Sequence, residues 1–480
     1  MCISKQRIPI GRLTLNQTPI EHVEKYAYLA SFTSGQLPKA WLGSSVTPMY
    51  KKGDKLQADN YRPISIAPTV VKIAEKIILN KLLPFALNTG IIPVQQHGFV
   101  PGRSVITNLL YCVDSWTASL DRKRPVDVIY FDFAKAFDRV PKMRLLHKLE
   151  HFGIRGTLLA WIDAFLTDRE FFVRVGDARS SVRTVLSGVP QGSVLGPALF
   201  LIYISDLAAI LKSKFSFYAD DLKIFADAME GSHTLQEDLD AVSGWSEEWL
   251  LPLNTEKCSV LHLGTSNLRH RYRLNGVTVK SVDVQNDLGV LITSNLSWSE
   301  HILHVTKRAN KLMYLIRKAF QGCSLQVYSG LFTVYVRPLL EFAGPVWCPI
   351  LVRDMQLLES VQRRATRMPF GPVRPAYEER LRIFHLTSFQ ERRLRGDLII
   401  VYRIIHNLLG VDLNNLFVLN MNNLRGHSLK LRKENFGTTV RQMFLSNRVF
   451  DTWNGLPEEV ISAPSVNAFK NRLDRVLFVS

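Results

Sequence analysis

Cysteine is scarce in this chain of 480 residues. None of the cysteines forms a Cys-x-x-Cys pair or a Cys/His cluster with the spacing of zinc ligands. We therefore expect neither a disulfide-stapled domain nor a zinc knuckle, and scattered thiols are typical of a reducing compartment. The expected location is intracellular, in the cytoplasm or the nucleus. The five cysteines are Cys2, Cys112, Cys258, Cys323 and Cys348.

Long apolar runs are also missing. The two most apolar stretches, residues 198–211 and 398–411, are interrupted by Asp206 in the first and by Arg403 and His406 in the second. The N-terminus lacks the apolar core of a signal peptide, and the chain has no short repeat or low-complexity tract. No membrane partner is expected.

Acidic residues are too few to balance the basic ones. The chain has 42 Asp and Glu against 60 Lys and Arg, which gives a net charge of +18. Such an excess predicts an anionic partner, because Lys and Arg release counterions from phosphate backbones. The apolar content of 46% is that of a folded protein, and the length allows more than one domain.

Two adjacent carboxylates, Asp220 and Asp221, lie between the strand-like runs 214–217 and 222–226. Neighbouring carboxylates at the tip of a hairpin repel each other, and a divalent cation removes that repulsion. Taken alone, an Asp-Asp pair is more often a solvated turn.

A third carboxylate, Asp132, falls near the end of the run 126–133, which is rich in β-branched and aromatic residues and predicts a buried strand. The alternative is an aspartate that caps the following turn. If this strand pairs beside the hairpin, Asp132 meets Asp220 and Asp221. Three carboxylates suit Mg²⁺, and two such ions about 3.5–4 Å apart would serve phosphoryl transfer.

A loop punctuated by glycine and proline, residues 187–197, precedes an apolar helix expected over residues 198–211. Glycines allow a backbone to approach a ligand closely, and a helix start favours anions. In isolation the loop would be interpreted as an ordinary connection from a strand to a helix.

These motifs, in this order, resemble those of a reverse transcriptase of the non-LTR (LINE-type, jockey-like) retrotransposon group. The resemblance covers about residues 37–292 and is weaker toward the C-terminus. The motifs that carry it are Asn60-Tyr61-Arg62-Pro63-Ile64-Ser65, Gln96-His97-Gly98-Phe99, Gly102-Arg103-Ser104, Phe131-Asp132-Phe133-Ala134-Lys135-Ala136-Phe137-Asp138, residues 187–197, and Tyr218-Ala219-Asp220-Asp221.

The resemblance implies a role for each matching residue. Asp132, Asp220 and Asp221 would be catalytic and bind metal, and Lys257 would protonate the departing pyrophosphate. Phe137 would exclude the 2′-hydroxyl of a ribonucleotide. Lys51 and Lys52 would face the triphosphate or form a solvated surface pair. The residues expected to bind nucleotide are Arg62, Phe133, Phe137, Gln191, Gly192 and Tyr218.

The implied fold is α+β, a right-hand polymerase with fingers, a palm of antiparallel sheet and helices, and a helical thumb. We expect an atypical segment 1–32, a reverse transcriptase domain 33–295 (fingers 37–121, palm 125–295), a thumb 296–370 and a helical region 371–480. Expected helices cover residues 69–87, 104–120, 233–251, 298–337 and 387–409. Expected hairpins cover 171–186 and 271–282, with a primer-grip turn at 286–290.

Basic residues in the expected thumb lie at near-helical spacing, which suits a helix along a nucleic-acid backbone or a merely solvated face. They are Lys307, Arg308, Lys311, Arg317 and Lys318.

The leading hypothesis is an RNA-directed DNA polymerase that uses an RNA template, a DNA primer, deoxynucleoside triphosphates and two Mg²⁺ ions, with Mn²⁺ as an alternative. We expect a truncated copy without the endonuclease domain of full-length elements. The competing hypothesis is an inactive remnant that only binds nucleic acid. An RNA polymerase is disfavoured by Phe137. Oligomeric state stays open.

Overall fold

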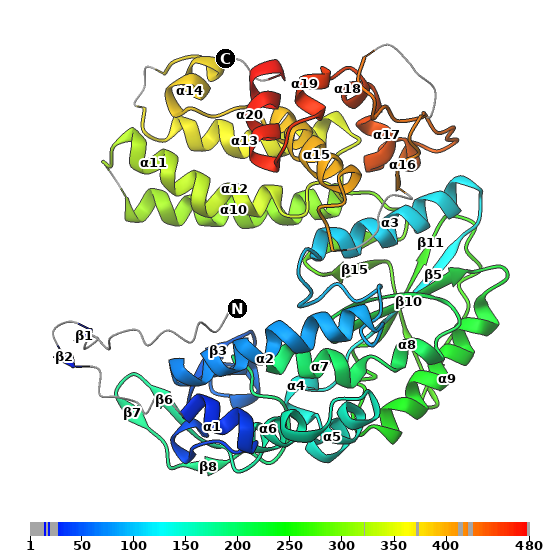
Figure 1. Ribbon diagram of the computed structural model, residues 1–480. Coiled ribbons are helices and arrows are strands. Elements are labelled where there is room, and N and C mark those ends of the chain that lie inside the picture. The colour runs from blue at the N-terminus through cyan, green and yellow to red at the C-terminus, as the bar shows by residue number, and fades with distance from the viewer. Residues whose placement is uncertain are drawn as a thin grey trace. The chain divides into compact units, whose positions relative to one another are not determined.

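The structure is a computed structural model (Figure 1). It describes residues 14–15, 18–19, 27–320, 322–370, 374–410, 416–420 and 426–477. The chain divides into two compact units, and each is described by itself. The first comprises Met1–Ile92, Lys135–Asp206 and Trp249–Leu251, and the second comprises Pro93–Ala134, Leu207–Glu248 and Pro252–Ser480.

The first unit contains a mixed sheet with the strand order β4-β3-β6-β7. β3 (Gly43–Tyr50) pairs antiparallel with β4 (Tyr61–Ile66) and parallel with β6 (Glu170–Val175). β6 also pairs with β7 (Ala178–Arg179) and β8 (Arg183–Thr184), which confirms the hairpin expected over residues 171–186. A separate short ladder joins β1 (Thr14–Leu15) to β2 (Thr18–Pro19).

Helix α2 (Thr69–Asn88) confirms the helix expected over residues 69–87. α7 (Gly196–Ile204) is apolar and buried on every side, as a central helix must be. The helix expected over residues 198–211 is wrong in length: it ends at Ile204, and the Ser205 hydroxyl donates back to the carbonyl of Ile202 (2.8 Å). The other helices of this unit are α1 (Ala27–Ser34), α4 (Ala136–Arg139), α5 (Lys142–His151) and α6 (Gly156–Leu166), with 3₁₀ turns at Lys39–Trp41 and Ala58–Asn60.

The second unit is built on a five-stranded sheet with the order β14-β11-β5-β10-β9. Its central strand β5 (Val126–Phe131) is buried at every residue, as the apolar run predicted. β5 pairs antiparallel with β10 (Asp221–Asp227) and with β11 (Ser259–Leu263), and β10 pairs antiparallel with β9 (Lys214–Tyr218).

The edge strand β14 (Lys280–Val282) corrects two expectations. It pairs parallel with β11, so the sheet expected to form the palm is not purely antiparallel. The hairpin expected over residues 271–282 is limited to β12 (Arg273–Leu274) and β13 (Val277–Thr278), because the chain then leaves β12 to join the larger sheet. A further hairpin joins β15 (Val284–Asp287) to β16 (Val290–Thr293) at the expected turn.

Helix α3 (Val105–Asp121) begins in a capping box formed by Ser104 and Thr107 and confirms the helix expected over residues 104–120. α9 (Ser232–Glu248) matches the expected helix 233–251 to within three residues at its end. The short helix α8 (Leu207–Ile210) precedes β9.

The helix expected over residues 298–337 is wrong as one continuous element. α10 (Ser299–Ala319) ends first, and Ser324 then caps α11 (Leu325–Leu331) by accepting from the Val327 amide. A π-helical turn, Phe332–Val336, and α12 (Arg337–Glu341) follow. The next helices are α13 (Val352–Arg367), α14 (Tyr377–Phe384) and α15 (Phe389–Ile405), the last inside the expected range 387–409.

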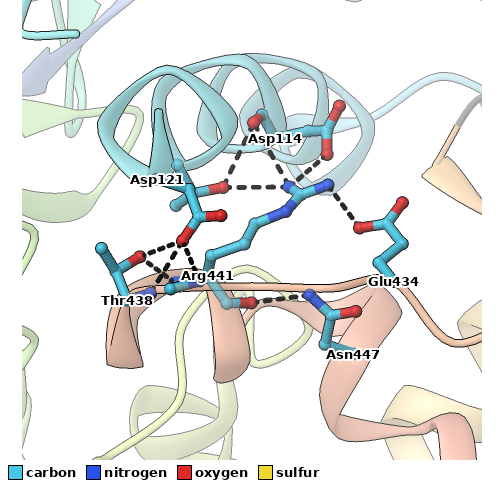
Figure 2. Close-up of polar contacts among 8 residues, drawn as sticks. Asp114, Asp121, Glu434, Thr438, Arg441 and Asn447 are labelled. Atoms are coloured by element: carbon cyan, nitrogen blue, oxygen red, sulfur yellow. Dashed lines mark hydrogen bonds and ion pairs between the residues drawn. The ribbon is translucent and has the colours of Figure 1, made fainter. Parts of the chain in front are cut away.

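The C-terminal segment docks on α3 through Arg441, as Figure 2 shows. The Arg441 guanidinium lies 2.7 Å from the Asp114 carboxylate and 2.9 Å from that of Glu434. Asp121 accepts hydrogen bonds from the amide and the hydroxyl of Thr438. The helices of this segment are α16 (Thr439–Gln442), α17 (Leu445–Arg448), α18 (Phe450–Asn454), α19 (Glu458–Ile461) and α20 (Val466–Leu477).

One apolar core runs through the second unit. It contains Trp116 of α3, Val128 of β5, Ile302 of α10, and Trp453 and Phe469 of the C-terminal segment. Helices and largely antiparallel sheets together confirm the α+β class. Within the described residues, no helix is long and apolar enough to cross a membrane.

Candidate active site

The two adjacent aspartates lie at the tip of the β9–β10 hairpin. Tyr218 is paired with Asp221 across the hairpin, so Ala219 and Asp220 form its two-residue turn. Ala219 adopts a left-handed backbone conformation (φ 57°), which is uncommon for a residue with a side chain. The turn therefore holds the aspartates in a conformation that the surrounding structure has to support.

Strand pairing brings the third carboxylate to this turn. β5 and β10 are antiparallel neighbours, with Phe131 opposite Leu222. Asp132 directly follows Phe131, and Asp221 directly precedes Leu222. The pairing that the sequence predicted is present, and it places Asp132 beside the aspartate pair.

The carboxylates affect one another. Removal from water, together with the negative charges of Asp220, Asp287 and Asp132, raises the pKa of Asp221 to about 7, against the opposing charge of Lys223. Asp221 is exposed to solvent at the hairpin tip, so its removal from water is incomplete and this contribution to the pKa is weakened. The repulsion among the carboxylates persists, and a bound cation would relieve it.

Lys257 lies next to Asp132. Its ammonium nitrogen is 3.4 Å from Oδ2 of Asp132, and both side chains are open to solvent (61% and 36% exposed). The backbone holds this arrangement: the amide of Asn254 donates to the carbonyl of Asp132 (2.7 Å), and that of Lys257 donates to the carbonyl of Asn254. The turn of residues 254–257 thus places the Lys257 ammonium group beside the Asp132 carboxylate.

A buried ion pair lies behind the aspartates. Lys223 of β10 and Asp287 of β15 are 2.5 Å apart, and both side chains are only 4% exposed. The Tyr130 hydroxyl also donates to Asp287 (3.3 Å). A cavity of about 170 Å³ is lined by this pair together with Asp132, Asp221 and Lys257. Sequence reasoning missed the pair, although a lysine within the apolar strand Leu222–Phe225 was a visible signal.

The chemistry of these carboxylates suits a hard divalent cation, because they offer only oxygen ligands and their negative charges repel one another. Among the residues that the structure describes, however, no three His, Cys, Asp or Glu side chains already converge as a metal site.

The loop of residues 187–197 lies in the first unit and is anchored on three sides. The Gln191 carbonyl accepts from the Ser65 amide (2.8 Å), and the Gln191 side chain donates to Asp138 (2.7 Å). Glu75, fully buried in α2, accepts from the amides of Val194 (2.6 Å) and Leu195 (2.8 Å). Sequence reasoning missed Glu75, because its hydrogen-bond partners Val194 and Leu195 lie far away in the sequence.

Glycine is required at position 192 because the loop approaches the backbone of β4 closely. Its φ is +100°, and an added Cβ would lie 2.5 Å from the carbonyl oxygen of Ser65. Only glycine fits this position without a shift of the loop or of β4.

Phe137 and Arg62 also lie in the first unit. The Phe137 ring stacks on Phe200 of the buried helix α7, with 4.2 Å between ring centroids. Arg62 is exposed on β4, and its charge reaches Asp138. Burial raises the pKa of Asp138, against the opposing effects of Gln191, Lys51, Lys135 and Arg62.

The predicted residues thus form two groups. Asp132, Phe133, Tyr218, Asp220, Asp221 and Lys257 lie in the second unit, and Arg62, Phe137, Gln191 and Gly192 lie in the first. The roles of these residues stay predictions.

The hairpin, the neighbouring carboxylate and the anchored loop define a polymerase-type domain, and comparison with known proteins agrees. Residues 50–311, more than half of the chain, match the family model described as reverse transcriptase (RNA-dependent DNA polymerase). The chain belongs to this family, which confirms the predicted polymerase fold.

Similar curated proteins come from mobile elements. The RNA-directed DNA polymerase from mobile element jockey of Drosophila funebris is 32% identical over 331 residues, which cover 65% of this chain and 36% of that protein. Its Drosophila melanogaster counterpart is 30% identical, with coverage of 62% and 34%. The probable RNA-directed DNA polymerase from transposon BS of D. melanogaster is 26% identical, with coverage of 74% and 41%. The chain therefore spans 34% to 41% of the length of these relatives.

Among solved structures, apo telomerase from Candida tropicalis matches with a TM-score of 0.41 and 11% identity, over 77% of this chain and 63% of that chain.

Proposed function

We propose that this chain is an RNA-directed DNA polymerase derived from a non-LTR retrotransposon. It would add deoxynucleotides to the 3′-hydroxyl of a DNA primer paired with an RNA template. The observation that carries the proposal is the pairing of β5 with β10, which sets Asp132 beside Asp220 and Asp221. Membership of the reverse transcriptase family supports it.

Asp132, Asp220 and Asp221 would hold two Mg²⁺ ions, with Mn²⁺ as an alternative. When bound, such ions lower the pKa of an attacking hydroxyl and neutralise charge on the transferred and departing phosphates. The crowding of the three carboxylates supports this assignment, because it favours a bound cation over the empty site.

The other residues would position the substrates. Lys257, exposed and close to Asp132, would donate a proton to the departing pyrophosphate. Phe137, fixed against Phe200, would leave no room for a 2′-hydroxyl. Arg62 would bind the triphosphate, since its guanidinium matches phosphate oxygens. The remaining contacts to nucleotide and template would come from Phe133, Gln191, Gly192 and Tyr218.

The expected partners are the RNA template, the DNA primer and deoxynucleoside triphosphates. The net charge of +18 supports a nucleic-acid partner. Along α10, Lys307, Lys311 and Lys318 are exposed opposite the buried Ile302 and Met313, as a helix facing a phosphate backbone requires.

We further propose an intracellular location and no membrane partner. The proposed organisation is fingers 37–121 and palm 125–295 within the domain 33–295, a thumb 296–370, a helical region 371–480 and an atypical segment 1–32.

Primer extension tests the proposal. The purified 480-residue chain is given an RNA template, a labelled DNA primer, Mg²⁺ and deoxynucleotides, beside Asp220→Ala and the matched variant Asp227→Ala. Asp227 is the last residue of β10, the strand that begins directly after Asp220. We expect extension by the parent and by Asp227→Ala and none by Asp220→Ala. Binding of RNA without any extension would instead identify an inactive remnant.

A further inference from the structure

A short segment, residues 95–98, runs along the outer edge of β9. The amide of His97 donates to the carbonyl of Phe217 (2.9 Å), and the amide of Phe217 donates to the carbonyl of Gln95 (3.0 Å). Gln96 and Phe217 form a parallel bridge. The segment therefore acts as a one-bridge extension of the sheet that carries the aspartate hairpin, and it lies in the same unit.

The side chain of Gln96 reaches the turn itself. Its Oε1 accepts hydrogen bonds from the amides of Ala219 and Gly98, both 2.8 Å, and its Nε2 donates to the carbonyl of Ala219 (3.2 Å). Gln96 is only 2% exposed. One buried amide group thus satisfies both the donor and the acceptor of Ala219.

Ala219 is the residue that most needs this support. It has the left-handed φ of 57° and directly precedes Asp220 and Asp221. A residue with a side chain keeps that conformation only where its surroundings fix it. Gln96 contacts the peptide group before Ala219 through its N–H and the one after it through its C=O, so it fixes the direction in which the next two side chains leave the turn.

Gly98 completes the fit. An added Cβ at Gly98 would lie 2.3 Å from the amide nitrogen of Ala219, a backbone atom that cannot move aside without moving the turn. The glycine therefore lets the segment approach closely enough for Gln96 to reach both polar groups of Ala219.

Arg103 fixes the segment from behind. Its guanidinium donates to the carbonyl of Gln96 (2.6 Å) and to those of Pro93 and Val94 (both 3.2 Å). Its Nε donates to the carbonyl of Gly410 (2.5 Å). These hydrogen bonds hold the backbone of the segment, and with it the position of Gln96.

We propose that Gln96 is a positioning residue for the aspartate pair, acting through both backbone groups of Ala219. This inference rests on the proposed polymerase function, which supplies the reaction that the aspartates serve. The contact requires an acceptor and a donor on one uncharged group. Gln96→Met removes both, whereas Gln96→Glu keeps the acceptor, loses the donor and adds a negative charge near three carboxylates.

The test compares Gln96→Met, Gln96→Glu and Gly98→Ala with the parent and with Gln95→Met. Gln95 is the matched control, because it joins this pairing through its backbone carbonyl. Single-turnover incorporation gives the maximal rate, primer–template titration gives Kd, and hydrogen exchange reports the β9–β10 turn. Because hydrogen exchange does not depend on catalysis, it tests the role of Gln96 separately from activity.

We expect Gln96→Met and Gly98→Ala to lower the maximal rate about 100-fold, as a misplacement near 1 Å does. Kd for primer–template should stay within about threefold, a difference of less than 1 kcal/mol. Exchange should accelerate in the turn and stay unchanged in α10. Gln96→Glu should also have a lowered maximal rate. Gln95→Met should have the parental rate, Kd and hydrogen exchange.

Three results would overturn the inference: parental rate and exchange in Gln96→Met, exchange that accelerates equally throughout the chain, or recovery of the rate by Gln96→Glu in its ionised form, because a protonated carboxyl group would keep both donor and acceptor. If the parent itself extends no primer, the proposed function fails, and exchange in the turn still decides the role of Gln96.

Discussion

Lys223→Met should destabilise the sheet locally, because it leaves Asp287 buried without its cation. The two side chains are 2.5 Å apart and each is 4% exposed, so solvent cannot replace the lost ammonium group. Burial lowers the pKa of Lys223, but the charge and hydrogen bond of Asp287, together with the effects of Cys112 and Asp221, raise it above the ordinary value. The native protein therefore keeps the lysine charged and the pair intact.

The expected cost follows from this burial. Removing one partner of a buried ion pair costs about 3–5 kcal/mol, whereas replacing both partners by apolar residues of similar volume is often neutral or stabilising. The Tyr130 hydroxyl, 3.3 Å from Asp287, is a neutral donor and does not compensate a full charge. We expect the upper half of this range for Lys223→Met and a cost below about 2 kcal/mol for Lys223→Met/Asp287→Leu.

Native-state hydrogen exchange of peptides from β10 and from the β15–β16 hairpin measures the local free energy of opening. The four proteins of the double-mutant cycle are compared at one pH. A cost below about 1 kcal/mol for Lys223→Met, or a double variant as unstable as the single one, would refute the reasoning.

Three more predictions concern other parts of the chain. Burial raises the pKa of Asp127, but hydrogen bonds from His262, Tyr272 and Asn267 outweigh it and leave the pKa below the ordinary 3.8. The stability that ionised Asp127 contributes is therefore complete above pH 3.8 and is lost as the pH falls further. The Tm of Asp127→Asn should accordingly fall less steeply than the parental Tm as the pH drops below 3.8. Glu75→Ala should raise KM for deoxynucleotides about tenfold in steady-state extension, because the loop loses two anchors, whereas Glu75→Gln should keep it near the parental value. Phe137→Ala should admit ribonucleotides, and unchanged rejection of ribonucleotides in single-nucleotide incorporation would remove Phe137 from the proposed role.

Much of the fold around the carboxylates follows from local sequence pattern. Helix α3, Val105–Asp121, was predicted to within one residue at each end, and its start is set locally by the capping box at Ser104. The pairing of β5 with β10 was a conditional expectation, and the buried run Val126–Phe131 justified it, since a strand without polar faces needs neighbours on both sides.

The contacts that support the site could not be predicted in the same way. Glu75 bonds Val194 across 119 residues of sequence, Lys223 meets Asp287 across 64, and Gln96 reaches Ala219 across 123. Spacing within a helix or strand carries no information about partners so far away. The ends of two expected helices were missed as well: α7 ends at Ile204 although apolar residues follow, and after α10 ends at Ala319 a new helix starts at the Ser324 cap.

The most direct test of the central claim is the sequence of the product made on an RNA template of mixed sequence. The parent and Asp132→Asn are supplied with Mg²⁺, all four deoxynucleotides and a labelled DNA primer. The account predicts a DNA product complementary to the template from the parent and none from Asp132→Asn, which alters a carboxylate beside the aspartate pair without changing its size. A product unrelated to the template, or an equal product from Asp132→Asn, would contradict it.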